Sequence, residues 1–348
     1  MPYRVEVGMD LHKEFSVFAS LNSKGKVLGV QKMFNDTRNF DNYFKQWSSK
    51  DVRVTVESTR GVTWVLDYLD QHGIAFVVAN PFLNRAIANV HCKNDTYDAT
   101  VLADLTRCNM VARCYVPSHA IRDLRDVIAH RNKLVQMSTK LKNKVHLLLA
   151  KYNLQQPYTS MFGPRGRTWL NKQNLSELHS SMLQENLELL NQLTPRINAL
   201  EVVIRNKVKD HPYYHLLQTI PGVGALNAAI IISRVDDISR FKGKMPKFIR
   251  YAGLSVNTRA SANKIHFGHI NKRSDKFLRT AFVDAAIVAK NKDAGLAAFY
   301  QYLLSIKGKG IARSAVARKL ARSAFWVMAK KQPYHYRQIQ PQWVAATR

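Results

Sequence analysis

Short β-rich runs and helical stretches follow one another in a set order over the first 118 residues, and this order limits the chain to few folds. Three β-rich runs come first, and the turn Asn22-Ser23-Lys24-Gly25 joins the second to the third as a hairpin. Strand and helix then alternate. The expected strands cover residues 4–9, 15–21, 27–34, 52–57 and 75–78, and the expected helices cover residues 40–47, 62–69 and 98–105. The pattern predicts an α/β domain.

Four acidic residues stand where this pattern would bring them together. Three meandering strands followed by strand–helix alternation are typical of an RNase H-like fold, whose catalytic acids lie at the end of the first strand and on a neighbouring strand. Asp10 ends the first expected strand and Glu57 ends the fourth. Asp95 and Asp98 stand three residues apart at the start of a helical stretch, so both lie on one helical face. We predict that the four carboxylates share one pocket.

Four carboxylates in one pocket predict cation-dependent phosphodiester chemistry. Mg²⁺ is a hard cation that takes oxygen ligands, and two such ions about 3.5–4 Å apart stabilise both the attacking and the leaving oxygen. Any one of these acids alone is more often a solvated cap or loop end, but the four together favour a site for two Mg²⁺ ions. We interpret His12, which follows Asp10 closely, as a packing or hydrogen-bonding residue without a catalytic role.

The charge of the chain indicates a polyanionic partner. The 348 residues carry a formal net charge of +29 and a pI near 10.2, which far exceeds what solubility requires. Beyond Asp237 the only acids are Asp275, Asp284 and Asp293, so the C-terminal third is the most basic part. A basic membrane-surface protein is the competing interpretation, but the sequence shows no apolar run of the ~18 residues that a transmembrane helix needs and no signal-peptide core. We expect a cytoplasmic, nucleoid-associated protein that binds nucleic acid.

Residues 119–209 change to a helical period and predict a coiled-coil domain. Apolar residues recur every seven positions over residues 127–148 and 183–204, which predicts two long antiparallel helices. A second series in the first helix is half polar, at Leu124, Arg131, Ser138 and Val145. Pro195 interrupts the second helix, so we expect a kink or a restart there, and residues 152–172 are typical of an extended basic loop. The basic faces of these helices either follow a phosphate backbone or are simply solvated.

Residues 210–348 predict a mostly helical and strongly basic domain. The sequence Ile220-Pro221-Gly222-Val223-Gly224 leads into an apolar helix and resembles the hairpin of a helix-hairpin-helix element. Glycines in such a hairpin let backbone N–H groups approach a phosphate at the positive end of a helix, although a Pro-Gly turn before any buried helix would look similar. Near the C-terminus an apolar stripe over residues 316–327 faces away from Arg318 and Arg322, and we interpret that helix as scaffold.

Several ordered motifs together carry a family resemblance. Near the N-terminus they are Gly8-Met9-Asp10-Leu11-His12-Lys13, Glu57-Ser58-Thr59-Arg60-Gly61 and Lys93-Asn94-Asp95-Thr96-Tyr97-Asp98-Ala99, and later they are residues 220–224, 251–264, 268–279 and 315–320. These motifs resemble those of the DEDD transposases of the insertion sequence 110 family, relatives of the Piv DNA invertase. The resemblance covers nearly the full length of the chain.

The resemblance implies three domains and a catalytic serine in the last of them. Residues 1–118 would form a RuvC-like domain with an RNase H fold and the acidic quartet, residues 119–209 a helical coiled-coil domain, and residues 210–348 a transposase domain. By motif position the catalytic serine is Ser261. We expect nucleic-acid contacts at Pro221, Gly222, Gly224, Arg259, Lys264, Lys272, Arg273 and Arg279.

The resemblance also implies partners. Members of this family are guided by a structured bridge RNA that pairs with both donor and target DNA, so the protein would read shape and backbone while the RNA reads sequence. A covalent phosphoserine link would conserve the bond energy needed to rejoin strands, so no ATP is required, in agreement with the absence of a P-loop motif. The quartet and Ser261 must meet by folding back or between subunits, and the family uses a composite site across the protomers of a dimer or tetramer.

Other functions stay open from the sequence. A protein-guided site-specific DNA invertase or a Holliday-junction resolvase would keep the quartet but need no guide RNA. A resolvase that uses metal-activated water would also not need Ser261. A structural nucleic-acid-binding protein with a decayed nuclease domain is the third possibility, although intact acids at all four positions argue against decay.

Overall fold

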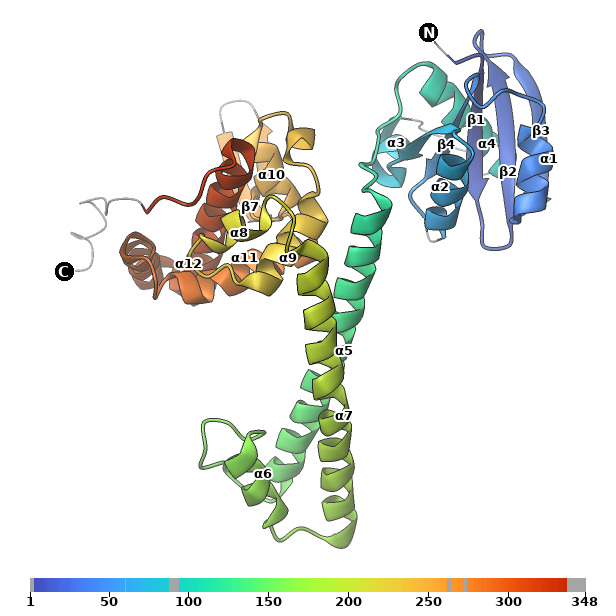
Figure 1. The fold of residues 1–348 in the computed structure, drawn as a ribbon. Helices are drawn as coiled ribbons and strands as arrows, with labels where there is room; N and C mark the ends of the chain where they lie inside the picture. The colour runs from blue at the N-terminus through green and yellow to red at the C-terminus, as the bar shows by residue number, and fades with distance from the viewer. Residues whose placement is uncertain (1–2, 60, 88–93, 262–263, 272–273, 337–348) are drawn as a thin grey trace. The chain divides into compact units, whose positions relative to one another are not determined.

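The computed structural model divides the chain into two compact units, residues 1–119 and 120–348. It describes residues 3–59, 61–87, 94–261, 264–271 and 274–336, which Figure 1 shows coloured along the sequence. The first unit is a mixed α/β structure, and the second is mostly helical. Each unit has its own hydrophobic core.

A five-stranded mixed sheet forms the centre of the N-terminal unit. Its strands are β1 (Val5–Leu11), β2 (Phe15–Asn22), β3 (Val27–Phe34), β4 (Val52–Glu57) and β5 (Ala75–Ala79). They lie in the order β3-β2-β1-β4-β5, with β1, β2 and β3 as an antiparallel meander and β4 parallel to both of its neighbours. The predicted α/β domain is confirmed, and its mixed sheet is consistent with an RNase H-like fold.

Helices cover both faces of this sheet. The helices of the unit are α1 (Thr37–Phe44), α2 (Val62–Gln71), α3 (Pro81–Ile87) and α4 (Asp95–Arg107). The odd-numbered residues of β1 and the even-numbered residues of β4 share one core with α1 and α2. On the opposite face, Ala99 and Ala103 of α4 pack on β2. Because side chains alternate along a strand, the even-numbered residues of β1 and the odd-numbered residues of β4 face α4.

The backbone of α4 lies directly on β1 at Gly8. A Cβ atom on Gly8 would lie 1.8 Å from the carbonyl oxygen of Ala99 and 2.7 Å from the amide nitrogen of Ala103. Only a residue without a side chain permits such an approach between two backbones. Gly8 therefore sets how closely α4 lies against the strand that ends in the acidic site.

We expect Gly8→Ala to lower the free energy of unfolding by about 3 kcal/mol, because the new methyl group would overlap backbone atoms that move only if α4 shifts. Thermal unfolding of the variant measures the loss. Gly29→Ala is the matched control, since a Cβ on Gly29 in β3 meets only the Ser20 hydroxyl, at 3.9 Å. Equal stability of the two variants would contradict the close contact between α4 and β1.

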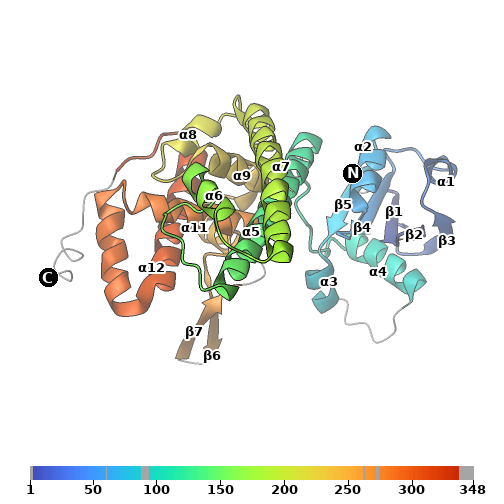
Figure 2. The same ribbon diagram turned by 90° about the horizontal axis from the view of Figure 1, so that it is seen from below.

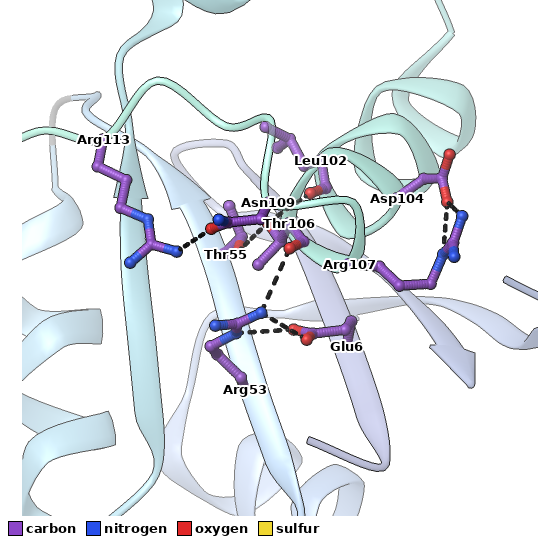
Figure 3. Close-up of polar contacts among 9 residues, drawn as sticks. All are labelled: Glu6, Arg53, Thr55, Leu102, Asp104, Thr106, Arg107, Asn109 and Arg113. Atoms are coloured by element: carbon purple, nitrogen blue, oxygen red, sulfur yellow. Dashed lines mark hydrogen bonds and ion pairs between the residues drawn. The ribbon is translucent and has the colours of Figure 1, made fainter. Parts of the chain in front are cut away.

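A buried ion pair and two threonines fix the C-terminal end of α4 on the sheet (Figure 3). Arg53 of β4 donates from Nε and Nη2 to the two carboxylate oxygens of Glu6, at 2.9 and 2.6 Å, and Nη2 also donates to the Thr106 carbonyl oxygen at 3.3 Å. The Oγ1 atoms of Thr55 and Thr106 are 2.6 Å apart. Loss of one partner from a buried ion pair costs about 3–5 kcal/mol. The helix is thus held at two points, at Gly8 and at its last turn.

Two long antiparallel helices open the C-terminal unit. They are α5 (His119–Lys151) and α7 (Glu177–Val208), and the short helix α6 (Pro164–Asn171) lies in the connection between them. Leu148 near the end of α5 packs in one cluster with Leu187 near the start of α7, so the two helices run antiparallel, as their period predicts. The expectation of an extended loop over residues 152–172 is wrong in part, because Met161 and Leu170 pack α6 and its approach against this cluster.

The half-polar series of α5 is buried more deeply than the apolar series. Ser138 and Val145 are buried, whereas Leu134 is only half-buried. Arg131 of the same series forms an ion pair with Glu201 of α7, and both side chains are mostly buried. An ion pair across the two helices lets a charged residue occupy a position that would otherwise require an apolar one.

Helix α7 runs through Pro195 without a break, so the predicted restart is wrong. Pro195 has no N–H group, and the Asn191 carbonyl therefore lacks its usual partner in the helix. Thr194 beside it donates from Oγ1 to the Leu190 carbonyl oxygen at 2.8 Å. Leu190 and Leu193 are both buried, and their packing keeps the helix intact on the side that precedes the proline.

A helical core completes the C-terminal unit, seen from a second direction in Figure 2. Its elements are α8 (Tyr214–Gln218), α9 (Ala225–Val235), η1 (Ile238–Phe241), α10 (Met245–Tyr251), the hairpin of β6 (Val256–Ser261) and β7 (Lys264–Ile270), α11 (Lys276–Ala289) and α12 (Ala294–Lys330). Ile121 and Leu124 of α5 and Ile204 and Val208 of α7 belong to the same core. The start of α5 and the end of α7 are therefore anchored in this core.

Helix α12 consists of two halves that meet at Gly308. Gly308 has a φ of 76° and a ψ of 168°, a conformation that glycine adopts without strain. The halves fold back on each other, since Nζ of Lys319 lies 4.1 Å from the centre of the Phe299 ring. Figure 2 shows the resulting helical hairpin.

Candidate active site

Asp10 and Glu57 lie at one edge of the sheet, on the face that α4 covers. Strands β1 and β4 are parallel and paired as far as Met9 and Val56, and Asp10 and Glu57 are the next residues along each strand. Both carboxylates are half-buried. Asp10 follows Gly8 on the side of β1 that faces α4, because alternate residues of a strand share a face.

Helix α4 begins at the same edge. The Asn94 side chain caps the helix, since its Oδ1 accepts a hydrogen bond from the Thr96 N–H at 3.1 Å. Asp95 and Asp98 stand in the first turn, where the positive end of the helix dipole stabilises negative charge. Both are half-buried. The first turn of α4 thus brings Asp95 beside Asp10 and His12.

His12 lies between two of these carboxylates. Its hydrogen bond to Asp10 agrees with the interpretation of His12 as a hydrogen-bonding residue, whereas its contact with Asp95 is not predicted by the strand pattern. Its Nε2 is 3.0 Å from Oδ2 of Asp10 and 3.3 Å from Oδ2 of Asp95. The turn between β1 and β2 holds this residue in place, because Asn35 donates from Nδ2 to the His12 carbonyl oxygen at 2.8 Å and the Phe15 ring lies 4.6 Å from the imidazole. His12 is the first residue after β1, two positions beyond Asp10, and this nearness in the sequence indicates the contact with Asp10 but not the contact with Asp95.

The electrostatics of Asp10 show that the acids act on one another. Burial is the main cause that raises the pKa of Asp10 above its ordinary value, and the charges of Asp95 and Asp98 raise it further. His12 opposes this shift through its charge and its hydrogen bond. Carboxylates that disfavour one another's charge are stabilised by a shared cation.

Three side chains form a donor set that fits a divalent metal ion. Asp10, His12 and Asp95 each offer one ligand atom, and these atoms lie within 4.8 Å of one another. Carboxylate oxygens suit Mg²⁺, Mn²⁺ and Ca²⁺, and an imidazole nitrogen suits transition metals as well. Asp98 and Glu57 lie outside this group of three, although Asp98 is close enough for its charge to act on Asp10.

A cleft opens beside His12 in the N-terminal unit. Its volume is about 410 Å³, which falls within the roughly 300–1,000 Å³ of ligand sites. Its walls are formed by Leu11, His12, Lys13, Thr59, Gly61 and Trp64. His12 belongs both to the walls of this cleft and to the donor set.

Ser261 belongs to the other unit. It is the last residue of β6, and its backbone pairs with Lys264, the first residue of β7. It therefore stands at the end of a β-hairpin. Its role as a nucleophile stays a prediction.

The expected phosphate-binding turn has one exposed glycine. Pro221 is buried, and Gly222, with a φ of 80°, packs so closely on α11 that a Cβ would lie 2.1 Å from the Ala285 carbonyl oxygen. Both residues therefore have a packing role, and their contact with nucleic acid stays a prediction. Gly224 is exposed at the N-terminus of α9, and a Cβ there would meet no atom within 4 Å, so this position leaves a phosphate free access.

The other expected nucleic-acid contacts lie around the β6–β7 hairpin. Arg279 is half-buried in α11 and donates from Nη2 to the Ser274 hydroxyl at 3.0 Å, which ties it to the turn before that helix. Arg259 and Lys264 stand on the two paired strands. Lys272 and Arg273 lie outside the described residues. The contacts of these basic residues with nucleic acid stay predictions.

Comparison with known protein families identifies the chain. Residues 7–154 match the DEDD group described as "Transposase", and residues 214–301 match the "Transposase IS116/IS110/IS902 family". The chain belongs to the IS110 family of DEDD transposases. The first match contains all four acids of the quartet, and the second contains Ser261. The resemblance seen in the sequence is confirmed.

Similar proteins are also described as transposases. The transposase for insertion sequence element IS1328 of Yersinia enterocolitica is 24% identical over 282 residues, which cover 79% of this chain and 83% of the relative. A probable family 20 transposase of Pseudomonas aeruginosa is 23% identical over 70% of this chain and 74% of its own length. The transposase for insertion sequence element IS1111A of Coxiella burnetii is 26% identical over 70% of this chain and 68% of its own length.

This IS110-family protein is therefore a DNA transposase, an enzyme that acts on DNA. Membership in the DEDD group suggests a divalent metal, and the cluster of Asp10, His12 and Asp95 supplies suitable ligands. Among the residues that the structure describes, no helix has both the length and the hydrophobicity to cross a bilayer.

Proposed function

We propose that this transposase cleaves and rejoins DNA strands with Mg²⁺ at the acidic quartet and with Ser261 as nucleophile, guided by a bridge RNA that pairs with donor and target DNA. The observation that carries the proposal is the meeting of Asp10 and Asp95 around His12 at the edge of the mixed sheet. Two carboxylates from different elements within ligand distance of one another match the donor set that phosphodiester chemistry needs.

The four acids would hold the cation together with His12. Asp10 and Asp95, with Asp98 and Glu57 beside them, would hold the cation, and a cation bound there supplies positive charge that stabilises the charge developing on the phosphate. His12 would supply its Nε2 as a third ligand, since this atom lies close to both carboxylates. The fixed positions of β1 and α4 keep this arrangement ready before the substrate binds.

Ser261 would attack the phosphorus atom with its Oγ. One P–O bond to serine forms, one P–O bond to the sugar breaks, the serine proton is released, and the displaced sugar oxygen takes up a proton. The phosphoserine link keeps the energy of the broken ester, so attack by a sugar hydroxyl of another strand regenerates the serine and completes recombination without ATP.

A homo-oligomer and a guide RNA belong to the same proposal. The quartet and Ser261 lie in different units of the chain, and both must act on the same phosphodiester, which a composite site across protomers of a dimer or tetramer would allow. The net charge of +29 supports binding to nucleic acid.

We expect a discrete small RNA to copurify when the chain is expressed together with the DNA that flanks its gene. Sequencing of the bound nucleic acid identifies the RNA, and a recombination assay with and without it tests the guide. Recombination by protein and DNA alone, with no RNA bound, would instead support a protein-guided invertase.

We also expect the affinity for duplex DNA to fall steeply with salt. The logarithm of the association constant should decrease linearly with the logarithm of the salt concentration, by about 0.9 for each phosphate contacted, because bound cations are released. Fluorescence anisotropy of a labelled duplex between about 50 and 200 mM salt measures this slope. An affinity that does not change with salt concentration would contradict binding through the positive charge of the chain.

A further inference from the structure

The outer side of the second half of α12 carries a row of cationic side chains interrupted by a tryptophan. Arg318, Arg322, Trp326 and Lys330 are all exposed and follow one another at intervals of four residues. Residues four apart lie above one another on a helix. The row therefore forms one continuous strip on the surface of the C-terminal unit.

A groove runs beside this strip. Its volume is about 380 Å³, and the residues that line it include Ser323, Trp326, Lys330, Gln332, His335 and Tyr336. One wall is the last turns of α12, and the other is the segment that follows the helix.

The second wall is held in place by Tyr334. Its backbone N–H donates to Oγ1 of Thr219 at 2.8 Å, and its hydroxyl donates to Oδ2 of Asp293 at 3.1 Å. Its ring also meets the ring of Tyr336 edge-on, with the two centres 5.4 Å apart. These contacts fix the segment against the core, so the groove exists before any ligand arrives.

Two aromatic rings on this surface are open to solvent. Trp326 is 41% exposed and Tyr336 is 66% exposed, although large aromatic side chains are usually mostly buried. Nζ of Lys330 lies 5.6 Å from the centre of the Trp326 ring, so a cation stands next to the exposed face. No Asp or Glu follows Asp293 in the sequence, so no carboxylate from this part of the chain opposes the positive charge.

We propose that this groove binds an unpaired stretch of nucleic acid, with a base stacked on Trp326 and the phosphates beside Arg318, Arg322 and Lys330. Aromatic rings on a basic surface recognise single strands, because an unpaired base offers its flat face whereas a base inside a duplex does not. The inference rests on the proposed function, in which DNA strands are opened and paired with RNA, and it assigns a place for a strand that is unpaired at that moment.

Helix α12 would then bind nucleic acid in addition to its role as scaffold. The buried stripe of Val316, Leu320 and Ala324 does form part of the core, as the sequence indicates. The opposite side of the same helix carries exposed cationic residues and Trp326, which the packing of the core does not explain. A purely structural explanation is that Lys330 and Trp326 support each other within the helix as residues four apart.

Binding of labelled oligonucleotides by the full chain separates these explanations. The probes are oligo-dT, oligo-U and a hairpin duplex, in buffer with EDTA so that no strand is cut, with fluorescence anisotropy as the readout. Trp326→Ala should weaken binding of a single strand about tenfold and binding of the duplex less than about twofold, because one stacked base is lost. Trp326→Phe, which keeps a ring, should restore most of the affinity. A difference between oligo-dT and oligo-U shows whether DNA or RNA occupies the groove.

Tyr158→Ala is the matched control, since Tyr158 is 39% exposed and lies on the connection between α5 and α6. It should bind single strands like the unchanged protein. Stacking also quenches tryptophan fluorescence, so addition of oligo-dT should lower the emission of the unchanged chain by more than that of Trp326→Phe.

Two results would overturn the proposal. Equal single-strand affinity for Trp326→Ala and Tyr158→Ala would leave only the structural role, and an equal loss for single strands and duplex would show a general charge surface. Neither result depends on cleavage, so the groove can fail while the acidic site still works. Conversely, a protein whose acidic site fails in a strand-transfer assay can still show the effect of Trp326→Ala.

Discussion

Asp98→Asn is expected to reduce DNA strand cleavage by at least about 10³-fold while the affinity for nucleic acid stays nearly unchanged. The substitution keeps the size of the side chain but removes a negative charge from the acidic edge, where Asp98 already acts on Asp10. Metal ions contribute several kcal/mol to phosphoryl transfer, and about 4 kcal/mol corresponds to a thousandfold in rate. A cleavage assay beside an anisotropy measurement separates the two effects, and calorimetric titration with Mg²⁺ should show weaker cation binding.

The same helix offers a control for this prediction. Asp104 is also on α4, is 50% exposed and pairs with Arg107 at 2.7 Å, away from the cluster. A surface pair of this kind contributes at most about 1 kcal/mol to stability, so Asp104→Asn should cleave DNA at nearly the normal rate. Loss of the helix-dipole interaction at Asp98 is of similar size, which cannot account for a thousandfold effect. Equal rates for the two variants would refute the metal site.

The sheet could be predicted because it depends on local patterns. Alternation of polar and apolar residues marks each strand, and the parallel pairing of β1 with β4 follows from the helix-containing connection. Asp10 and Glu57 end two such strands, so their approach requires only the correct strand order. The meeting of Asp10 with Asp95 agrees with the prediction of one pocket, whereas Glu57 and Asp98 lie outside the group of three.

The position of His12 could not be predicted from the same patterns. Strand periodicity says which face a residue occupies, but the approach of His12 to Asp95 depends on where the backbone of α4 crosses β1. That crossing is set by Gly8, whose role becomes visible only when the helix is in place. A glycine in a buried strand was the signal, because it permits another backbone to come close.

Features that depend on contacts between segments far apart in the sequence could not be predicted from local patterns either. Arg131 places a charge in the half-polar series of α5, and Glu201 compensates it from 70 residues away. Pro195 predicts a kink or a restart, but burial of the neighbouring leucines keeps α7 continuous through it. The close approach of Gly222 to α11 is a packing requirement that the turn sequence alone does not reveal. In each case a tertiary contact outweighed a local preference.

The choice between a serine recombinase and a resolvase depends on one hydroxyl group. A resolvase that uses metal-activated water needs the quartet alone, which the N-terminal unit contains in full. A recombinase with a phosphoserine intermediate needs Ser261 as well, at the end of β6. The acidic site is common to both mechanisms, so its variants cannot distinguish them.

Ser261→Ala is therefore expected to abolish both rejoining and the covalent protein–DNA adduct, with a loss of at least about 10³-fold, while duplex binding stays intact. Removal of a catalytic nucleophile commonly costs this much or more, because water cannot replace a positioned hydroxyl group. A labelled DNA substrate analysed on a denaturing protein gel reports the adduct. Ser255→Ala is the control, since Ser255 lies just before the same strand and its backbone carbonyl, which accepts from the Asn271 N–H at 3.1 Å, is unchanged by the substitution. Continued cleavage by Ser261→Ala without an adduct would identify water as the nucleophile and replace the recombinase mechanism with that of a resolvase.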